Sequence, residues 1–348
     1  MAVKKKPNGV ETLKKDLQAG NPGSLYLLYG EEDYLKKHYL EELKTTLVDE
    51  TFAEFNLVLL EGRGLTPEML SEAVESYPAF AERKLVVVND FDLYKPPAAF
   101  QGMLAALLSD LPDYICLVFY YDTLAFKPDK RTKMHAILDK NACFAEFTHL
   151  DERELIAWVR RRVRALGKDM DQDTCAYLIF LCGTSMTNLI TEIEKAAAHC
   201  TIDEIKRYNI DAVCTRVLDA VIFDLTDAIT ARRFDKAVVI VGDLLAQKNT
   251  EVAIFSAILR HVQRLYAAKL SAQSNGSSNE LSALIGSGSS FYAQKLKNAA
   301  RSVRLEWLRG AVRICGETDA ALKSSAADKQ KVLELALLQM ASNFEGTA

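Results

Sequence analysis

The sequence predicts an α/β domain built on a parallel sheet, followed by two domains made only of helices. Before residue 150, short apolar segments alternate with stretches of helical periodicity. From Asp151 onward the apolar strand-like segments stop, and helical patterns follow one another. Continuous apolar strands separated by helices indicate a parallel sheet covered on both faces, since each strand is buried on both sides.

The predicted strands are short apolar runs that end at glycine or at polar residues. The clearest reads SLYLLYG and stops at Gly30. Runs of this length, bounded by turn-forming residues, are typical of buried strands. The predicted strands lie at residues 24–30, 55–60, 84–88, 114–120 and 143–147.

Helices are predicted between these strands and through the rest of the chain. Residues 31–48 repeat large apolar side chains at four-residue steps from Leu35 to Leu47, which places them on one helical face. Thr66 before Pro67 is typical of an N-cap and a first helical turn. Further helices are predicted at residues 97–108, 129–138, 173–182, 187–199, 217–231, 234–247, 251–270, 293–301, 304–322 and 329–342, with one more that begins at Asp151.

A chain of 348 residues is long enough for two or three domains. We expect the α/β domain at residues 1–149, a three-helix domain at 150–209 and a larger helical domain at 210–348. Residues 203–215 are interpreted as a connection between the two helical domains. Residues 271–290, rich in Ser, Gly and Asn, are interpreted as a mobile loop around a short apolar turn.

The composition indicates an ordinary globular protein of the cytoplasm. A net charge of -4 excludes a global basic field that would draw the chain to nucleic acid or to a membrane surface. The longest apolar run, at residues 114–121, is far shorter than the roughly 20 residues needed to cross a bilayer. The start of the sequence, MAVKKKP, has no apolar leader behind it. We therefore expect no membrane partner.

In a sheet of this class, a nucleotide phosphate would bind in the loop after the first strand. Such a loop reads G-x-x-x-x-G-K-[ST], whereas this chain has GEEDYLK from Gly30 to Lys36. Glu31, Glu32 and Asp33 stand where phosphates would lie, and each like-charge contact at ~4 Å would cost about 4 kcal/mol at an effective dielectric near 20. The segment favours an acidic helix start, suited to the helix dipole, and predicts no bound cofactor.

The sequence shows no catalytic or metal-binding constellation. The third strand ends at Asn89 and Asp90, where a metal site would need an Asp-Glu pair, so a turn is the preferred interpretation. The seven cysteines form no C-x-x-C motif and are expected to be scattered reduced thiols. A zinc site would need clustered ligands. We therefore predict no catalytic residue, no metal ligand and no intrinsic enzymatic activity.

Phe80 is the candidate for a contact residue. It lies in the segment YPAFAER, from Tyr77 to Arg83, among Pro, Ala and charged residues and just before the third strand. One interpretation is that its ring packs under the sheet edge and supports the corner at Pro78. The other is that the ring is an exposed anchor for a partner's apolar pocket, since interfaces concentrate energy in such aromatic residues.

The strongest basic cluster is RRRVR, from Arg160 to Arg164. Arginine can bind phosphates bidentately, so DNA or a neighbouring subunit is a possible contact for Arg160, Arg161 and Arg164. Consecutive helical residues fan around the axis, however, which favours a solvated face over one continuous patch.

Seven segments of the chain carry a resemblance to a known family: LYLLYGEEDYL (25–35), FNL (55–57), YPAFAERKLVVV (77–88), NLITEIEK (188–195), FDLTDAI (223–229), RHVQRL (260–265) and ETDAALK (317–323). In this order and spacing, they resemble the delta subunit of the clamp loader of bacterial DNA polymerase III. The similarity runs over nearly the whole chain, and the segment from Tyr77 to Val88 resembles the clamp-contacting segment of that family with its strand.

The resemblance implies an ATPase-like first domain with a degenerate nucleotide loop, a three-helix lid and a helical collar that joins a ring of five subunits. It implies as partners the sliding clamp (the beta subunit), the gamma/tau and delta prime subunits, and primed DNA within the assembled complex. The subunit would grip the clamp and favour its opened form, with energy from ATP bound by sister subunits. It would belong to a DNA-directed DNA polymerase holoenzyme without transferring nucleotides itself.

The resemblance also implies the clamp-binding residues. In the family, a branched aliphatic residue followed by Phe enters a pocket on the clamp. Here Phe80 matches the aromatic residue, but Ala79 stands at the aliphatic position, and Tyr77 or Pro78 would have to compensate. The change to Ala removes burial worth up to ~2 kcal/mol.

Two alternative functions remain open from the sequence. The chain could be an active ATPase of the same superfamily, with nucleotide binding near Gly30. It could also be a DNA-binding module that uses the basic cluster at Arg160, in which case its binding would fall steeply with salt.

Overall fold

The computed structural model describes residues 8–100, 102–231, 233–274, 277–286, 289–323 and 328–342. The chain divides into two compact units, Met1–His149 and Leu150–Ala348, and each is described by itself. The further division of the second unit at residue 209 stays a prediction.

The first unit contains the predicted parallel sheet. Its five strands pair in the order β2-β3-β4-β1-β5, all parallel. The predicted strands are confirmed as β1 (Leu25–Gly30), β2 (Leu57–Glu61), β3 (Lys84–Asn89), β4 (Ile115–Tyr120) and β5 (Cys143–Phe147). This order places the carboxyl ends of β1 and β4 side by side, where ligands bind in open α/β sheets.

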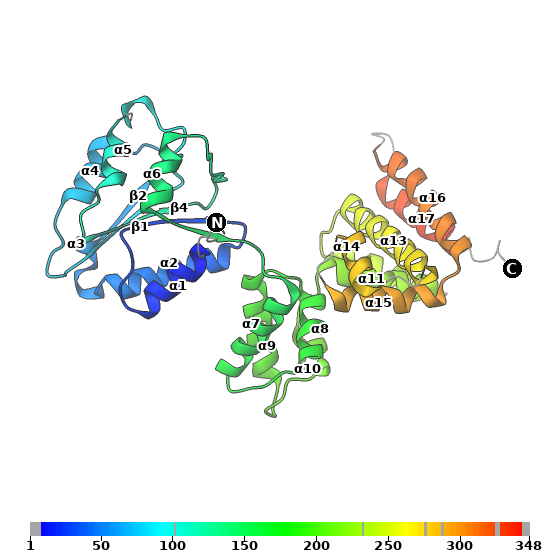
Figure 1. Ribbon diagram of the computed structural model, residues 1–348. Helices are drawn as coiled ribbons and strands as arrows, with labels where there is room; N and C mark the ends of the chain where they lie inside the picture. Colours follow the sequence, from blue (N-terminus) through cyan, green and yellow to red (C-terminus); the bar gives the residue numbers. More distant parts are fainter. Residues whose placement is uncertain are drawn as a thin grey trace. The chain divides into compact units, whose positions relative to one another are not determined.

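Helices cover both faces of this sheet, as the continuous apolar strands predict (Figure 1). One face packs on apolar side chains of α4 (Pro67–Glu75), α5 (Met103–Ser109) and α6 (Lys133–Asn141). The opposite face packs on α1 (Gly9–Gln18) and α2 (Asp33–Leu47). Helix α4 begins as predicted, with the Thr66 hydroxyl accepting a hydrogen bond from the amide of Met69 at 3.3 Å.

Several predicted bounds in this unit were wrong. Phe55 and Asn56 do not start a strand, because they belong to α3 (Ala53–Asn56), which follows the short 3-10 turn η1 (Glu50–Phe52). The helix predicted at 97–108 is broken by Gly102, whose φ of +85° lies in the left-handed region. Among the described residues of this predicted helix, the 3-10 turn η2 (Ala98–Phe100) precedes Gly102.

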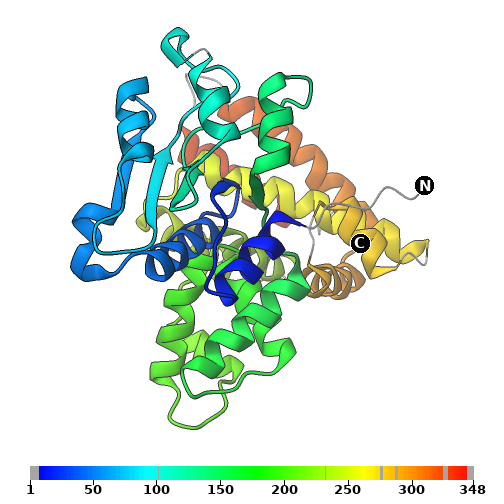
Figure 2. The same cartoon turned by 60° about the vertical axis from the view of Figure 1, so that its left-hand side comes forward.

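The described part of the second unit is helical, with an isolated β-bridge between Asp169 and Glu204. Its helices follow one another through green, yellow and red in both views (Figure 1 and Figure 2). The bounds are α7 (Glu152–Ala165), α8 (Gln172–Cys182), α9 (Met186–His199), α10 (Arg207–Val213), α11 (Leu218–Thr230), α12 (Phe234–Ala246), α13 (Glu251–Gln273), α14 (Ser278–Leu284), α15 (Ser290–Ser302), α16 (Leu305–Leu322) and α17 (Lys329–Ser342).

Two interpretations of the sequence are corrected in this unit. The expected connection at 203–215 contains α10, so four helices rather than three precede α11. The expected mobile loop at 271–290 contains the end of α13 and the whole of α14. Helix α14 forms because Ser277 and Glu280 make a capping box, with reciprocal hydrogen bonds of 3.1 and 2.7 Å. Residues 275, 276, 287 and 288 lie outside the described part.

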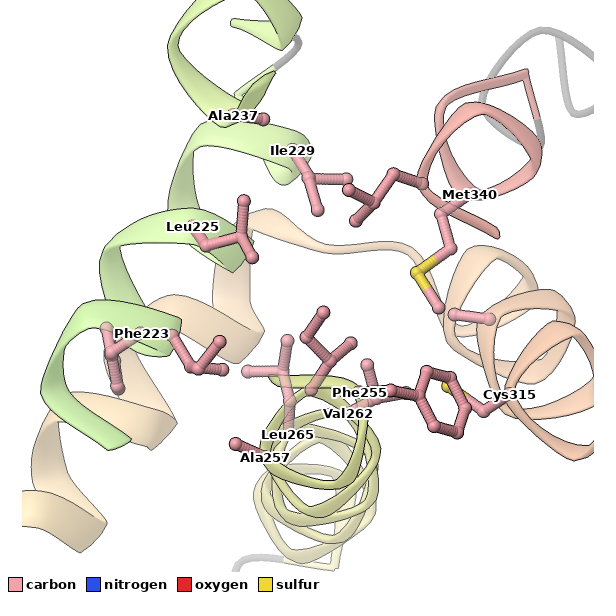
Figure 3. Close-up of a cluster of buried hydrophobic side chains, with 14 of the residues drawn as sticks. Phe223, Leu225, Ile229, Ala237, Phe255, Ala257, Val262, Leu265, Cys315 and Met340 are labelled. Carbon is pink, nitrogen blue, oxygen red and sulfur yellow. The ribbon is translucent and has the colours of Figure 1, made fainter. Parts of the chain in front are cut away.

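The largest apolar core of the second unit lies among its later helices. Figure 3 shows side chains of four helices meeting there: Leu225 of α11, Val262 of α13, Cys315 of α16 and Met340 of α17. The indole of Trp307 is buried in the same cluster and donates a hydrogen bond to the backbone oxygen of Met340 at 2.9 Å. This bond ties α16 to the end of α17.

No single helix in the described ranges is long and apolar enough to cross a membrane. Helices α8 and α9 pass that test only as a pair, and the pair is bent by 119°.

A buried histidine makes the stability of the second unit depend on pH. His261 on α13 packs edge-on against the ring of Phe223, with 4.8 Å between ring centroids. Burial, together with the nearby cations Arg264 and Lys295, lowers the pKa of His261 to about 3 from an ordinary 6.5. The unfolded chain therefore takes up a proton at a pH where the folded chain does not, and stability falls as the pH drops below 6.5.

We expect His261→Leu to reduce the decrease in the free energy of unfolding as the pH falls from 7 to 5. In the parent protein, His261 lowers the free energy of unfolding by about 1.4 kcal/mol for each pH unit below the pKa that the residue has in the unfolded chain. Between pH 7 and pH 5 this amounts to about 2 kcal/mol. Urea unfolding of the second unit at both pH values measures the difference. The control is His199→Gln at an exposed position of α9, which should keep the parent slope. An unchanged slope in His261→Leu would contradict the assignment.

Candidate partner-binding site

The segment between α4 and β3 presents two aromatic rings to solvent. The side chain of Phe80 is 85% exposed and that of Tyr77 is 80% exposed. Pro78 and Ala79 between them are half-buried. The interpretation that Phe80 packs beneath the sheet edge was therefore wrong, and the outward placement is what the structure has.

A buried amide holds this segment by its backbone. Asn56, the last residue of α3, is 0% exposed. Its side-chain nitrogen donates to the backbone oxygen of Ala79 at 2.8 Å, and its side-chain oxygen accepts from the backbone nitrogen of Ala79 at 2.8 Å. Both polar groups of the residue before Phe80 are thus fixed by one side chain.

Phe80 itself adopts a backbone conformation that L-residues avoid. Its φ of +54° lies in the left-handed region, which costs a residue with a side chain about 1–2 kcal/mol. Such strain persists only where the surrounding contacts determine it. Here the Asn56 bonds hold the preceding residue, and the Phe80 ring rests against that of Phe52, with 5.2 Å between centroids. The ring is held on one side and open on the other.

The two ends of the segment are also anchored. At its start, the ring of Tyr77 packs on that of Tyr114, with 4.9 Å between centroids. At its end, the guanidinium of Arg83 donates to the backbone oxygens of Pro22, Gly23 and Ile115, the last two at 3.2 Å. The segment is therefore a fixed turn between two anchors, and its exposed rings are presented by a rigid support.

Further exposed apolar residues lie close in sequence to the buried amide. Phe55 on α3 and Leu59 on the edge strand β2 are both exposed. Sequence reasoning missed them because it placed the apolar run FNLVLL inside a buried strand. It also missed Asn56, whose only signal is a polar residue within that run.

The loop after β1, where a nucleotide would bind, is filled by its own side chains. Lys36 stands at the lysine position of the phosphate-loop pattern but is 2% exposed. Its ammonium donates to the backbone oxygen of Tyr121 at 2.9 Å and pairs with Asp33 at 2.8 Å. Gly30 has a φ of +117°, and a Cβ there would lie 2.2 Å from the backbone oxygen of Phe147. The loop is thus packed against the end of β5, with its lysine already paired.

Asp90 at the end of β3 forms the turn that the sequence favours. Its carboxylate accepts hydrogen bonds from the amides of Asp122, Thr123 and Leu124 at 2.9–3.1 Å and from the Thr123 hydroxyl at 2.6 Å. Burial alone would raise the pKa of Asp90, but these hydrogen bonds outweigh it and lower the pKa. The carboxylate pins the loop after β4.

The basic cluster on α7 is not one surface. Arg160 is half-buried with its Nε enclosed, whereas Arg161 and Arg164 are exposed. The Nε of Arg164 lies 3.5 Å from a carboxylate oxygen of Asp169, an exposed ion pair worth little to stability. Arg164 is one helical turn from both Arg160 and Arg161, but only Arg161 and Arg164 are exposed. A contact of these residues with DNA or another subunit stays a prediction.

Two family models match this chain, one in each unit. The model of the DNA polymerase III delta subunit matches residues 26–148. The model of the C-terminal domain of the DNA polymerase III delta subunit matches residues 219–340. The chain belongs to the DNA polymerase III delta subunit family. The resemblance of the sequence segments is thereby confirmed.

Individual members of the family agree over most of the chain. DNA polymerase III subunit delta of Bacillus subtilis is 25% identical over 95% of this chain and 96% of its own length. The probable DNA polymerase III subunit delta of Aquifex aeolicus is 21% identical over 89% of each chain. The solved structure of the Bacillus subtilis DNA clamp loader delta protein has a TM-score of 0.58 and 23% identity, covering 96% of this chain and 99% of that one. This likeness supports the fold described above.

We expect Asn56→Asp to destabilise the first unit by about 1–3 kcal/mol. The carboxylate can still accept from the amide of Ala79, but its second oxygen would face the Ala79 carbonyl and leave that buried acceptor without a donor. Urea unfolding of the first unit measures the loss. Asn21→Asp adds the same charge at an exposed position of this unit and should unfold like the parent. Equal stability of the two variants would refute the clamping role of Asn56.

Proposed function

We propose that this protein is a non-catalytic clamp-loader subunit that binds the ring-shaped sliding clamp and favours its opened form, so that the ring can be loaded onto primed DNA. The observation that carries the proposal is the outward ring of Phe80, held in a strained backbone by Asn56. Family membership supports the clamp-loader role, and the exposed turn supplies a surface suited to gripping a partner.

The geometry of the turn suits an anchor residue. Aromatic side chains that enter a partner's pocket dominate the energy of many interfaces, and truncation of one costs about 2 kcal/mol or more. Phe80 meets this requirement without rearrangement, because its backbone is fixed before the partner arrives. Pre-organisation reduces the entropy lost on binding. Tyr77 and the half-buried Pro78 and Ala79 would form the surface around the anchor.

Binding can open a ring only through a difference in affinity. A ligand shifts an equilibrium between two states by as much as it binds one of them more tightly. The grip on the clamp must therefore be tighter in the opened form. A rigid turn favours such discrimination, because it cannot adapt its shape to fit the closed and the opened clamp equally well.

The proposal assigns no ATP hydrolysis to this chain. Lys36, the residue at the phosphate-binding position, is already paired with Asp33 and Tyr121. ATP bound by sister subunits would supply the energy, and the helical unit would join the gamma/tau and delta prime subunits. A cytoplasmic location goes with this role.

We expect Phe80→Ala to weaken binding of the cognate sliding clamp by about 30-fold or more, which corresponds to about 2 kcal/mol. Alanine keeps the left-handed strain at this position, so the variant removes the ring without relaxing the turn. Surface plasmon resonance with the purified subunit and clamp, without ATP, measures the change. The matched control is Tyr208→Ala, which removes an exposed ring from α10 in the other unit. If both variants bind like the parent, Phe80 is not the anchor.

We expect Ala79→Leu to strengthen clamp binding, by up to about 2 kcal/mol if the added side chain is fully buried. Leucine restores the branched aliphatic residue that precedes Phe in the family. The same binding measurement applies, with Ala81→Leu as the control that adds equal volume after Phe80. Similar gains in affinity from both variants would indicate nonspecific hydrophobic binding. They would count against a clamp pocket that receives the side chain of residue 79.

A further inference from the structure

Three side chains with metal-ligating atoms meet inside the first helices of the second unit. Cys182 is the last residue of α8, Glu192 lies on α9, and Cys214 follows the end of α10. The two sulfur atoms and a carboxylate oxygen all lie within 4.8 Å of one another. Cys182 and Glu192 are buried and Cys214 is half-buried. No sequence motif indicates this cluster, because Cys182, Glu192 and Cys214 are not closely spaced along the chain.

Hydrogen bonds already orient two of these side chains. The Glu192 carboxylate accepts from the backbone amide of Thr215 at 2.9 Å and from the ammonium of Lys195 at 2.6 Å. The thiol of Cys214 lies 3.5 Å from the backbone oxygen of Glu192. Lys195 also donates to the Thr215 hydroxyl at 3.1 Å. Such outer contacts fix ligand orientation in metal sites.

We infer that Cys182, Glu192 and Cys214 form a binding site for a thiophilic divalent cation, Zn²⁺ by their ligand chemistry. Zinc binds thiolates at about 2.3 Å and carboxylate oxygens at about 2.0–2.2 Å with tetrahedral geometry, which sets neighbouring ligand atoms roughly 3.5–3.8 Å apart. The present separations need only a small closure around an ion. The partly open side at Cys214 leaves the fourth position to solvent.

The charges of the site also balance with an ion bound. Two thiolates and the Glu192 carboxylate carry three negative charges, which Zn²⁺ and the Lys195 ammonium neutralise. Without an ion, two neutral thiols and the Glu192–Lys195 pair are neutral as well. The pocket therefore carries no uncompensated buried charge in either state, since the two protons released by the thiols leave as the ion enters.

Ion binding would join the ends of α8 and α10 to the middle of α9. The packing of α8, α9 and α10 against one another would then depend on the bound ion. This inference does not rest on clamp binding and is tested separately from it.

The test uses the full-length protein, reduced and stripped of metal with a chelator, and titrated with Co²⁺ as a spectroscopic probe for Zn²⁺. We expect one ion per chain, with thiolate-to-cobalt charge-transfer absorption and the d–d bands of tetrahedral cobalt, and displacement by Zn²⁺. Cys214→Ser should weaken binding at least about tenfold, and Lys195→Met, which removes an outer contact and one neutralising charge, by about tenfold. The control is Cys200→Ser, a buried thiol whose hydrogen bonds to the backbone oxygens of Ile202 and Glu204 a hydroxyl can replace.

Cys200→Ser should bind Co²⁺ like the parent. The inference is overturned if the reduced parent protein shows no charge-transfer band, or if Cys214→Ser binds as tightly as Cys200→Ser. Air-oxidised protein could also show a Cys182–Cys214 disulfide while the reduced protein shows no charge-transfer band. That result would overturn the metal site and identify the two cysteines as a redox pair.

Discussion

A pair of hydrogen bonds between the buried side chain of Asn56 and the backbone of Ala79 holds the turn on which the proposed partner contact depends. These bonds cross between α3 and the turn before β3, and they hold the backbone of the residue that precedes Phe80. Phe80 then has to accept a left-handed backbone with its ring outside. A strained, exposed aromatic residue is costly to the folded state on its own, and this cost supports the proposed contact with a partner.

In the same unit, polar groups at the carboxyl ends of the strands bond to the chain itself. At the carboxyl ends of β1 and β4, where ligands bind in open α/β sheets, the ammonium of Lys36 bonds to Tyr121 and Asp33. Asp90 at the end of β3 pins the next loop by several hydrogen bonds. The side chains of Lys36 and Asp90 are thus both engaged by internal hydrogen bonds. The exposed turn before β3, in contrast, presents the rings of Tyr77 and Phe80 to solvent.

The sequence was sufficient where one kind of signal determined the structure. Continuous apolar runs predicted all five strands, and the signal was strongest for β1, β3 and β4, which are buried along nearly their whole length. Short helices such as α10 and α14 were missed, since a few capping contacts form them rather than a long apolar face. The exposure of Phe80 was left between two alternatives, because the backbone beside it is held by Asn56, a residue distant along the chain. The meeting of Cys182 with Cys214 likewise requires the packing of three helices.

The most direct test of the central claim is a double-mutant cycle between Asn56→Asp and Phe80→Ala, read as clamp-binding free energy. If Asn56 acts by presenting the Phe80 ring, its substitution should cost affinity in the parent and almost none once the ring is gone. The expected coupling is about 1 kcal/mol or more. Strictly additive losses, within about 0.5 kcal/mol, would contradict the account by showing that the two residues act independently.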